Sequence, residues 1–205
     1  MKLLFSLFSA AVIVMISGCY AFSTFQSAKT VENGHWQVTG SYSTISFENN
    51  GSSSHTNDNL EVMFRSGAGE RSDIGIRYAR LLIDDIGDYN LISFEPKFMI
   101  VRDKLSFFMP ISLYFGKNVS ESESFHISPG FIATFPFNKN FEASFSPRYM
   151  IYTDPNSDNL LAFNFGIGLS SNLDKWALRP ELGYLFNPGN DGHYVQFGVG
   201  LSLTH

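Results

Sequence analysis

The side chains best suited to catalysis in this chain are a histidine, a serine and a glutamate in its central part. His126 and Ser128 are separated by one residue, which places both on one face of a β-strand. Glu142 falls at the start of the apolar segment that follows. A histidine can activate a serine hydroxyl when a carboxylate orients the imidazole, so these three residues are candidates for nucleophilic hydrolysis.

The segment around His126 resembles the His-x-Ser element of outer-membrane lipid A deacylases. An asparagine follows the serine in that family, whereas Pro129 follows it here. The strand pattern described below places His126 near one rim and Glu142 at the other end of its strand, so an antiparallel register keeps them apart. We therefore expect His126 to belong to an interior network and the chain not to be an enzyme, with a lipid A-modifying hydrolase as the alternative.

The sequence contains no motif for binding a metal ion or a phosphate-containing cofactor. The five histidines are scattered, and no spacing of His, Asp and Glu suggests a metal site. The pairs Gly67/Gly69 and Gly166/Gly168 lack the following helix that a phosphate-binding loop requires. We expect no metal and no cofactor, and we interpret these glycines as small residues that relieve crowding.

The elements that would position these residues are about ten β-strands, in which every second side chain is large and apolar. In residues 105–116, for example, Leu105, Phe107 and Leu113 alternate with smaller or polar side chains. The predicted strands are residues 35–47, 59–65, 73–82, 89–101, 105–116, 125–135, 141–152, 160–170, 175–186 and 193–203. Longer polar connections (48–58, 117–124, 153–159, 187–192) alternate with short ones (102–104, 138–140, 172–174), as in outer-membrane barrels.

Composition favours the same class of protein. Charged residues make up 16% of the chain, against about 25% in ordinary soluble domains, and 21 of the 205 residues are phenylalanine. Beyond the N-terminal segment no stretch approaches the roughly 18 apolar residues of a spanning helix. The predicted fold is all-β, an antiparallel up-and-down transmembrane β-barrel. Eight or twelve strands remain alternatives, because prolines inside the proposed strands (Pro96, Pro110, Pro129, Pro147, Pro180) require bulges or strand ends.

The N-terminus predicts export. Lys2, an apolar run and small residues resemble a secretory signal peptide over residues 1–18. Ile16-Ser17-Gly18-Cys19 resembles the bacterial lipobox, which implies lipidation of Cys19; cleavage after Ala21 is the alternative. We interpret residues 19–34 as a lipidated tether and residues 35–205 as the barrel domain. Removing Lys2 changes the net charge from −5 to −6, which argues against nucleic acid as a partner.

The two strand faces predict a filled lumen. If the apolar face meets lipid, the other face carries charges of both signs, which can be buried only when paired. This predicted interior network comprises Glu61, Arg65, Arg77, Glu95, Lys97, Glu142, Arg148, Arg179 and Glu181, with His126 beside it. Such a lumen is not a porin channel. Trp36, Phe135, Phe141 and Trp176 would form a periplasmic aromatic girdle, and Tyr78, Tyr89, Tyr149, Tyr184 and Tyr194 an outer one.

The segment from residue 35 onward resembles the small bacterial outer-membrane β-barrels, the OmpA/OmpX-like superfamily in the broad sense. The last strand, with Val195, Phe197, Val199, Leu201 and Leu203 on one face, looks like their C-terminal assembly signal, although His205 replaces the usual final Phe. The resemblance implies outer-membrane location, contact with membrane lipid and lipopolysaccharide, and recognition by the barrel-assembly machinery. We expect a structural or surface-interaction role through the outer loops, whose ligand is unknown. Gly34-His35-Trp36 supports an alternative, a soluble lipocalin-like lipid carrier, and a soluble sandwich is another.

Overall fold

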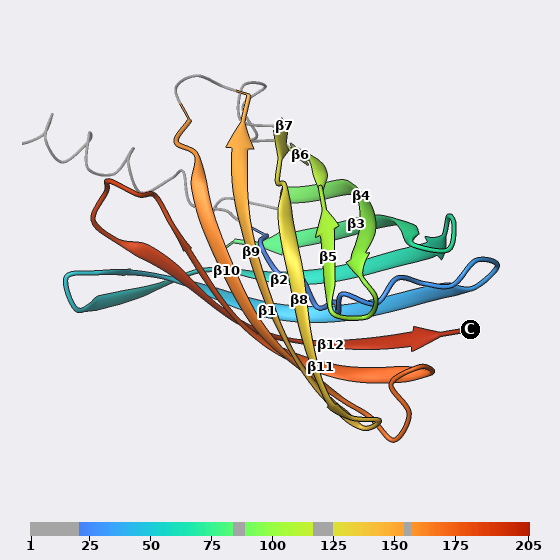
Figure 1. The fold of residues 1–205 in the computed structure, drawn as a ribbon. Helices are drawn as coiled ribbons and strands as arrows, with labels where there is room; N and C mark the ends of the chain where they lie inside the picture. The colour runs from blue at the N-terminus through green and yellow to red at the C-terminus, as the bar shows by residue number, and fades with distance from the viewer. Residues whose placement is uncertain (1–20, 84–88, 117–124, 154–156) are drawn as a thin grey trace, which may run out of the picture.

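The computed structural model describes residues 21–83, 89–116, 125–153 and 157–205. Their strands form one antiparallel sheet that closes into a barrel, because β1 pairs with β2 on one side and with β12 on the other (Figure 1). The strands are β1 Trp36–Asn49, β2 Ser52–Gly67, β3 Ser72–Leu82, β4 Tyr89–Val101, β5 Leu105–Phe108, β6 Ile111–Gly116, β7 Phe125–Ile127, β8 Gly130–Asn138, β9 Phe141–Tyr152, β10 Leu160–Leu169, β11 Trp176–Phe186 and β12 His193–Thr204.

Within the described residues the chain crosses the barrel ten times, although the sheet contains 12 strand segments. β5 and β6 both pair with β4 and are separated only by Met109 and Pro110. β7 and β8 both pair with β9 and flank Ser128 and Pro129. Because buried and outward side chains alternate without interruption through both breaks, each pair of segments is one strand. The prediction of an antiparallel barrel with about ten strands is confirmed.

The prolines interrupt the hydrogen-bond ladder less than expected. Strand assignment breaks at Pro110 and Pro129, and a register shift follows Pro136. Neighbouring strands still use the proline carbonyls: the Met109 amide donates to Pro96 at 3.1 Å, and the Ser128 amide to Pro110 at 2.8 Å. A proline lacks only its donor, so the strands hold together through the remaining acceptors.

Residues 48–58, predicted as a loop, are almost entirely strand. β1 and β2 continue to a turn of two residues, Asn50 and Gly51, with φ of 49° and 79°. Two positive φ angles identify a type I′ hairpin turn, which favours Asn-Gly. The prediction was wrong because the Ser- and Asn-rich composition suggested a loop. Of the other predicted outer loops, residues 117–124 and 154–156 lie outside the described residues.

The apolar strand faces point out of the barrel. Phe165 is 55% exposed and its ring centroid lies 4.8 Å from that of Phe145 on β9. Phe107 packs outside against Phe131 of the neighbouring passage. A lipocalin-like carrier requires these side chains to line a cavity, so that alternative is wrong. We call the barrel end with the β1–β2 and β11–β12 turns the loop end, and the end with Trp36 and His205 the turn end.

Candidate functional site

The described part of the chain before β1 fills the barrel interior. Residues 21–28, 30 and 31 are buried. Ala21 lies at the loop end, where its amide donates to the Tyr114 hydroxyl at 3.3 Å, and Asn33 bridges to Gly67 at the turn end. We call residues 21–32 the plug; it is the first blue segment in Figure 1. The tether interpretation of residues 19–34 did not include this path through the lumen.

Two aromatic rings of the plug rest on glycines of the barrel wall. Phe22 is fully buried at the loop end against Ile45, Met150, Leu160 and Leu185. A Cβ atom added to Gly183 would lie 2.7 Å from the Phe22 ring, and one added to Gly198 would lie 2.7 Å from the Phe25 ring. Since both distances are shorter than van der Waals contact, β11 and β12 are shaped to the plug.

Glu181 of β11 binds the centre of the plug through its backbone. One carboxylate oxygen accepts the amide of Thr24 and the other accepts the amide of Phe25, each at 2.7 Å. Phe25 has a φ of 47°, in the left-handed region that bulky residues rarely adopt. Successive amides that point to one side in this way form an anion-binding concavity, which the carboxylate occupies here.

Other lumen side chains satisfy the rest of the plug backbone. Arg77 donates to the Ser23 carbonyl at 2.8 Å, and Lys97 donates to the Lys29 carbonyl at 2.9 Å. The amide of Ala28 donates to the Thr134 hydroxyl, and the amide of Val31 donates to the Asp73 carboxylate, both at 2.8 Å. A buried backbone without a neighbouring strand needs such partners. The charged lumen is therefore a binding site for an extended peptide segment of the same chain.

The charged side chains also pair with one another. Arg77 lies 2.8 Å from Glu61 and 2.7 Å from Glu95. Arg65 contacts both Asp73 and Glu95, and Lys97 lies 3.4 Å from Asp73. This cluster connects β2, β3 and β4 beneath the plug.

The remaining predicted network residues line the opposite wall. Glu142 and Arg179 pair at 2.8 Å, close to the turn end. Arg148 donates to the Ser23 carbonyl at 3.2 Å, and its guanidinium carbon lies 5.9 Å from the centre of the Phe108 ring. The structure thus places all nine predicted network residues inside the barrel, where each is buried.

Asp73 is a network residue that the sequence interpretation missed. With it, the described lumen holds five buried carboxylates and five buried cations, so the interior charge is balanced. Asp73 shares the strand face of Gly75 and Arg77, and this alternation was the available signal.

The candidate hydrolytic residues are not brought together. His126 and Ser128 are buried on the lumen face at the loop end, with the His126 ring between Tyr114 and Tyr152. Glu142 is the second residue of β9, whereas His126 pairs with Tyr152 at the far end of that strand, a separation of about 33 Å along the strand. No triad forms, because the antiparallel register separates the base from the carboxylate.

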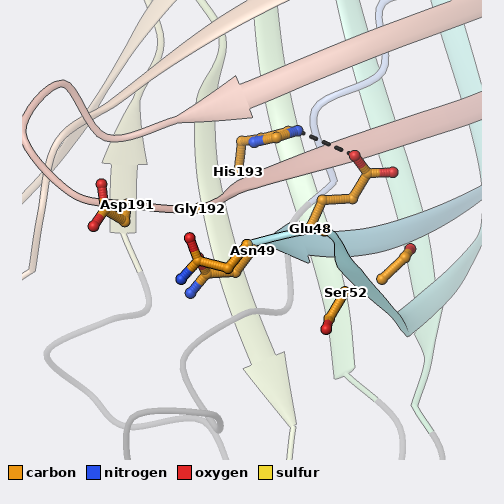
Figure 2. A pocket seen from close by; sticks show the side chains of 9 residues that line it. Glu48, Asn49, Ser52, Asp191, Gly192 and His193 are labelled. Carbon is orange, nitrogen blue, oxygen red and sulfur yellow. Dashed lines mark hydrogen bonds and ion pairs between the residues drawn. The ribbon is translucent and has the colours of Figure 1, made fainter.

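A polar cavity of about 300 Å³ opens at the rim of the loop end, between the β1–β2 hairpin and the β11–β12 connection (Figure 2). The His193 ring nitrogen lies 3.2 Å from the Glu48 carboxylate and joins the two elements. Asn49, Ser52 and Asp191 add amide, hydroxyl and carboxylate groups. This lining can hydrogen-bond a polar ligand.

Within the described ranges, no three His, Cys, Asp or Glu side chains are grouped so as to hold a metal ion. No helix in the same ranges is long and apolar enough to cross a membrane.

No protein-family model and no curated protein matches the sequence. Among solved structures, the chain is similar to Ail, the attachment invasion locus protein of Yersinia pestis, with a TM-score of 0.39 and 10% identity over 84% of this chain and 99% of Ail. It is similar to Neisserial surface protein A, with a TM-score of 0.37 and 10% identity over 83% and 99% of the two chains. For the translocator domain of the autotransporter NalP from Neisseria meningitidis the values are 0.43 and 10%, over 97% and 95%.

Proposed function

We propose that this chain is a plugged, non-conducting β-barrel lipoprotein of the bacterial outer membrane with a surface-interaction role at its loop end. The observation that carries the proposal is the inverted distribution of side chains. Many large apolar residues on the outside of the barrel are 37% to 65% exposed, while the charged network lies within. Contiguous exposed apolar surface of this extent is unfavourable in water and matches the lipid-facing band of a membrane barrel.

The closed sheet also satisfies the backbone hydrogen-bonding groups, which a lipid bilayer requires of any segment that spans it. Every strand in the described ranges has a hydrogen-bonded neighbour on both sides, so none of these strands presents an open edge to hydrocarbon. Trp36 and Trp176 are exposed at the turn end, and Tyr78, Tyr149 and Tyr184 are exposed toward the loop end. Amphipathic rings at these two levels suit the interfaces with the lipid and lipopolysaccharide headgroups.

The plug supports the non-conducting part of the proposal, and bilayer recordings test it. The full chain should give no conductance steps, whereas deletion of residues 22–32 should give stable ion conductance, because the charged lumen then fills with water. Lys29→Ala, which alters an exposed side chain of the plug region, should stay silent. A conducting full chain would contradict the proposal, and a heat-dependent shift on unboiled gels checks that each variant folds.

The lipobox supports lipidation at Cys19. Mass spectrometry of the mature N-terminus should find an acylated Cys19, and Cys19→Ala should abolish the modification. An unmodified mature chain that starts at Phe22 would exclude the lipoprotein part while leaving the barrel unaffected.

The loop end is proposed as the interaction surface, with the rim cavity as its candidate binding site. Glu48→Ala combined with His193→Ala removes the contact that joins the two elements. The double variant should lose adhesion of expressing cells to a surface that the wild-type chain binds, and Glu70→Ala at the turn end should retain it. Equal adhesion of both variants would exclude the cavity.

A further inference from the structure

The direction of the plug has a consequence for the chain end that precedes it. At the loop end Ala21 contacts Tyr114, and Phe22 packs in an apolar cluster. Further along the plug Thr24 binds Glu181. At the turn end Val31 binds Asp73, and Asn33 bridges to Gly67. The chain then enters β1 at Trp36, beside the C-terminal His205. Residue 21 and residue 36 therefore lie at opposite ends of the barrel.

A barrel with an even number of strands ordinarily has both chain ends on the periplasmic side. Here the plug carries the N-terminal end back through the lumen to the opposite end of the barrel. Ala21 is tied to the loop end by its own amide and by the packing of Ala21 against Leu81, Leu91 and Tyr114. Cys19 lies two positions before Ala21 in the sequence, and two extended residues reach at most about 7 Å. The hydrocarbon core of a membrane is about 30 Å thick, so Cys19 cannot reach the turn end from there.

We propose that the mature chain is threaded outward through its own barrel, so that its N-terminal end and the lipid on Cys19 lie at the outer face of the membrane. This inference rests on the proposed outer-membrane orientation and lipidation. The acyl chains then insert into the outer leaflet beside the barrel, whereas a tether from the turn end would place them in the inner leaflet.

Contacts of the next four residues of the plug also keep Ala21 at the loop end. Phe22 is fully buried, Ser23 is bound by Arg77 and Arg148, and Thr24 and Phe25 are bound by Glu181. Four successive residues would have to be released before the N-terminal end could reach the turn end. These contacts fix the outward direction of the chain.

Single-thiol labelling tests the proposal in intact cells with a membrane-impermeant maleimide. Cys19 is the sole cysteine of the chain, and lipidation blocks its thiol, so the wild type should not react. Tyr20→Cys then carries one free thiol next to the lipid. Ser52→Cys marks the loop end, and His205→Cys marks the turn end; both wild-type side chains are exposed.

Tyr20→Cys and Ser52→Cys should react on intact cells as fully as on permeabilised cells, whereas His205→Cys should react only after permeabilisation. If Tyr20→Cys instead follows His205→Cys, the threading is overturned and the proposed orientation stands. If Ser52→Cys and His205→Cys exchange their behaviour, the proposed orientation itself fails. A reactive wild-type chain would show a free Cys19 and overturn lipid placement. These are single substitutions, and the heat-dependent gel shift confirms that each variant is folded.

Discussion

Glu181 is the residue on which the plug depends most directly, because its two oxygens accept successive plug amides and also the Asn164 side chain. Glu181→Ala leaves these three donors without their buried acceptor. Removing one partner from a buried charge network costs about 3–5 kcal/mol, so the urea midpoint of the refolded chain should fall accordingly. The urea midpoint of Glu181→Gln should lie between those of the wild type and Glu181→Ala. Exposed Glu70→Ala should change stability by less than about 0.5 kcal/mol, and equal effects of the two alanine variants would contradict this role.

Gly183 offers a second test at the level of single side chains. Gly183→Ala forces its new methyl group toward the Phe22 ring and should destabilise the fold by about 1–3 kcal/mol. In a Phe22→Ala background the conflicting ring is gone, so the same change should cost less, with a coupling energy above about 0.5 kcal/mol. Gly40→Ala is the control, since nothing lies within 4 Å of its added Cβ. Strictly additive effects in chemical denaturation would show that Phe22 does not rest on Gly183.

The plug as an element can be locked in place. A Cβ added to Gly200 lies 3.1 Å from the Phe25 Cβ, so a shift of a few tenths of an ångström brings the two atoms to the roughly 3.5–4.5 Å spacing of a disulfide. Phe25→Cys with Gly200→Cys should therefore cross-link on oxidation. Closing so long a loop stabilises a fold by about 4–5 kcal/mol in the chain-entropy model. The temperature of the heat-dependent gel shift should rise, and reductant should reverse the rise.

Phe25→Cys with Gly40→Cys is the matched control for this lock, because Gly40 lies on the outer face of β1. It should not cross-link. A disulfide in the control, or none in the Gly200 pair, would mean that the plug does not lie against β12.

The elements differ in how far the sequence could predict them. β4 and β9 were predicted with the bounds that the structure shows, because period-two alternation follows directly from which face is apolar. The lumen position of Arg77 and Glu181 follows from the same alternation. The plug was not predictable in this way. Its residues, such as Thr24 and Gln26, are held by side chains distant in sequence, and that kind of binding produces no periodicity.

At the scale of the whole molecule, the outward apolar side chains form a belt around the barrel, and the position of a residue in this belt predicts how deep it lies in the bilayer. Phe165 sits at the middle of β10, whereas Phe137 lies at the turn end of β8, and both point outward with 55% and 65% exposure. An arginine on the lipid face costs about 2–4 kcal/mol at the midplane and about 0–1 kcal/mol near the interfaces. Phe165→Arg should therefore lose several times more stability than Phe137→Arg when unfolded from lipid vesicles.

The comparison distinguishes bilayer depth from simple loss of a phenylalanine, because both substitutions remove the same ring and add the same charge. In detergent micelles, which adapt around a charge more readily than a bilayer, the difference between Phe165→Arg and Phe137→Arg should shrink. Equal losses in vesicles would mean that β10 does not cross the hydrocarbon core at Phe165. The exposed belt would then require a partner other than lipid, and the membrane position of the whole barrel would have to be reassigned.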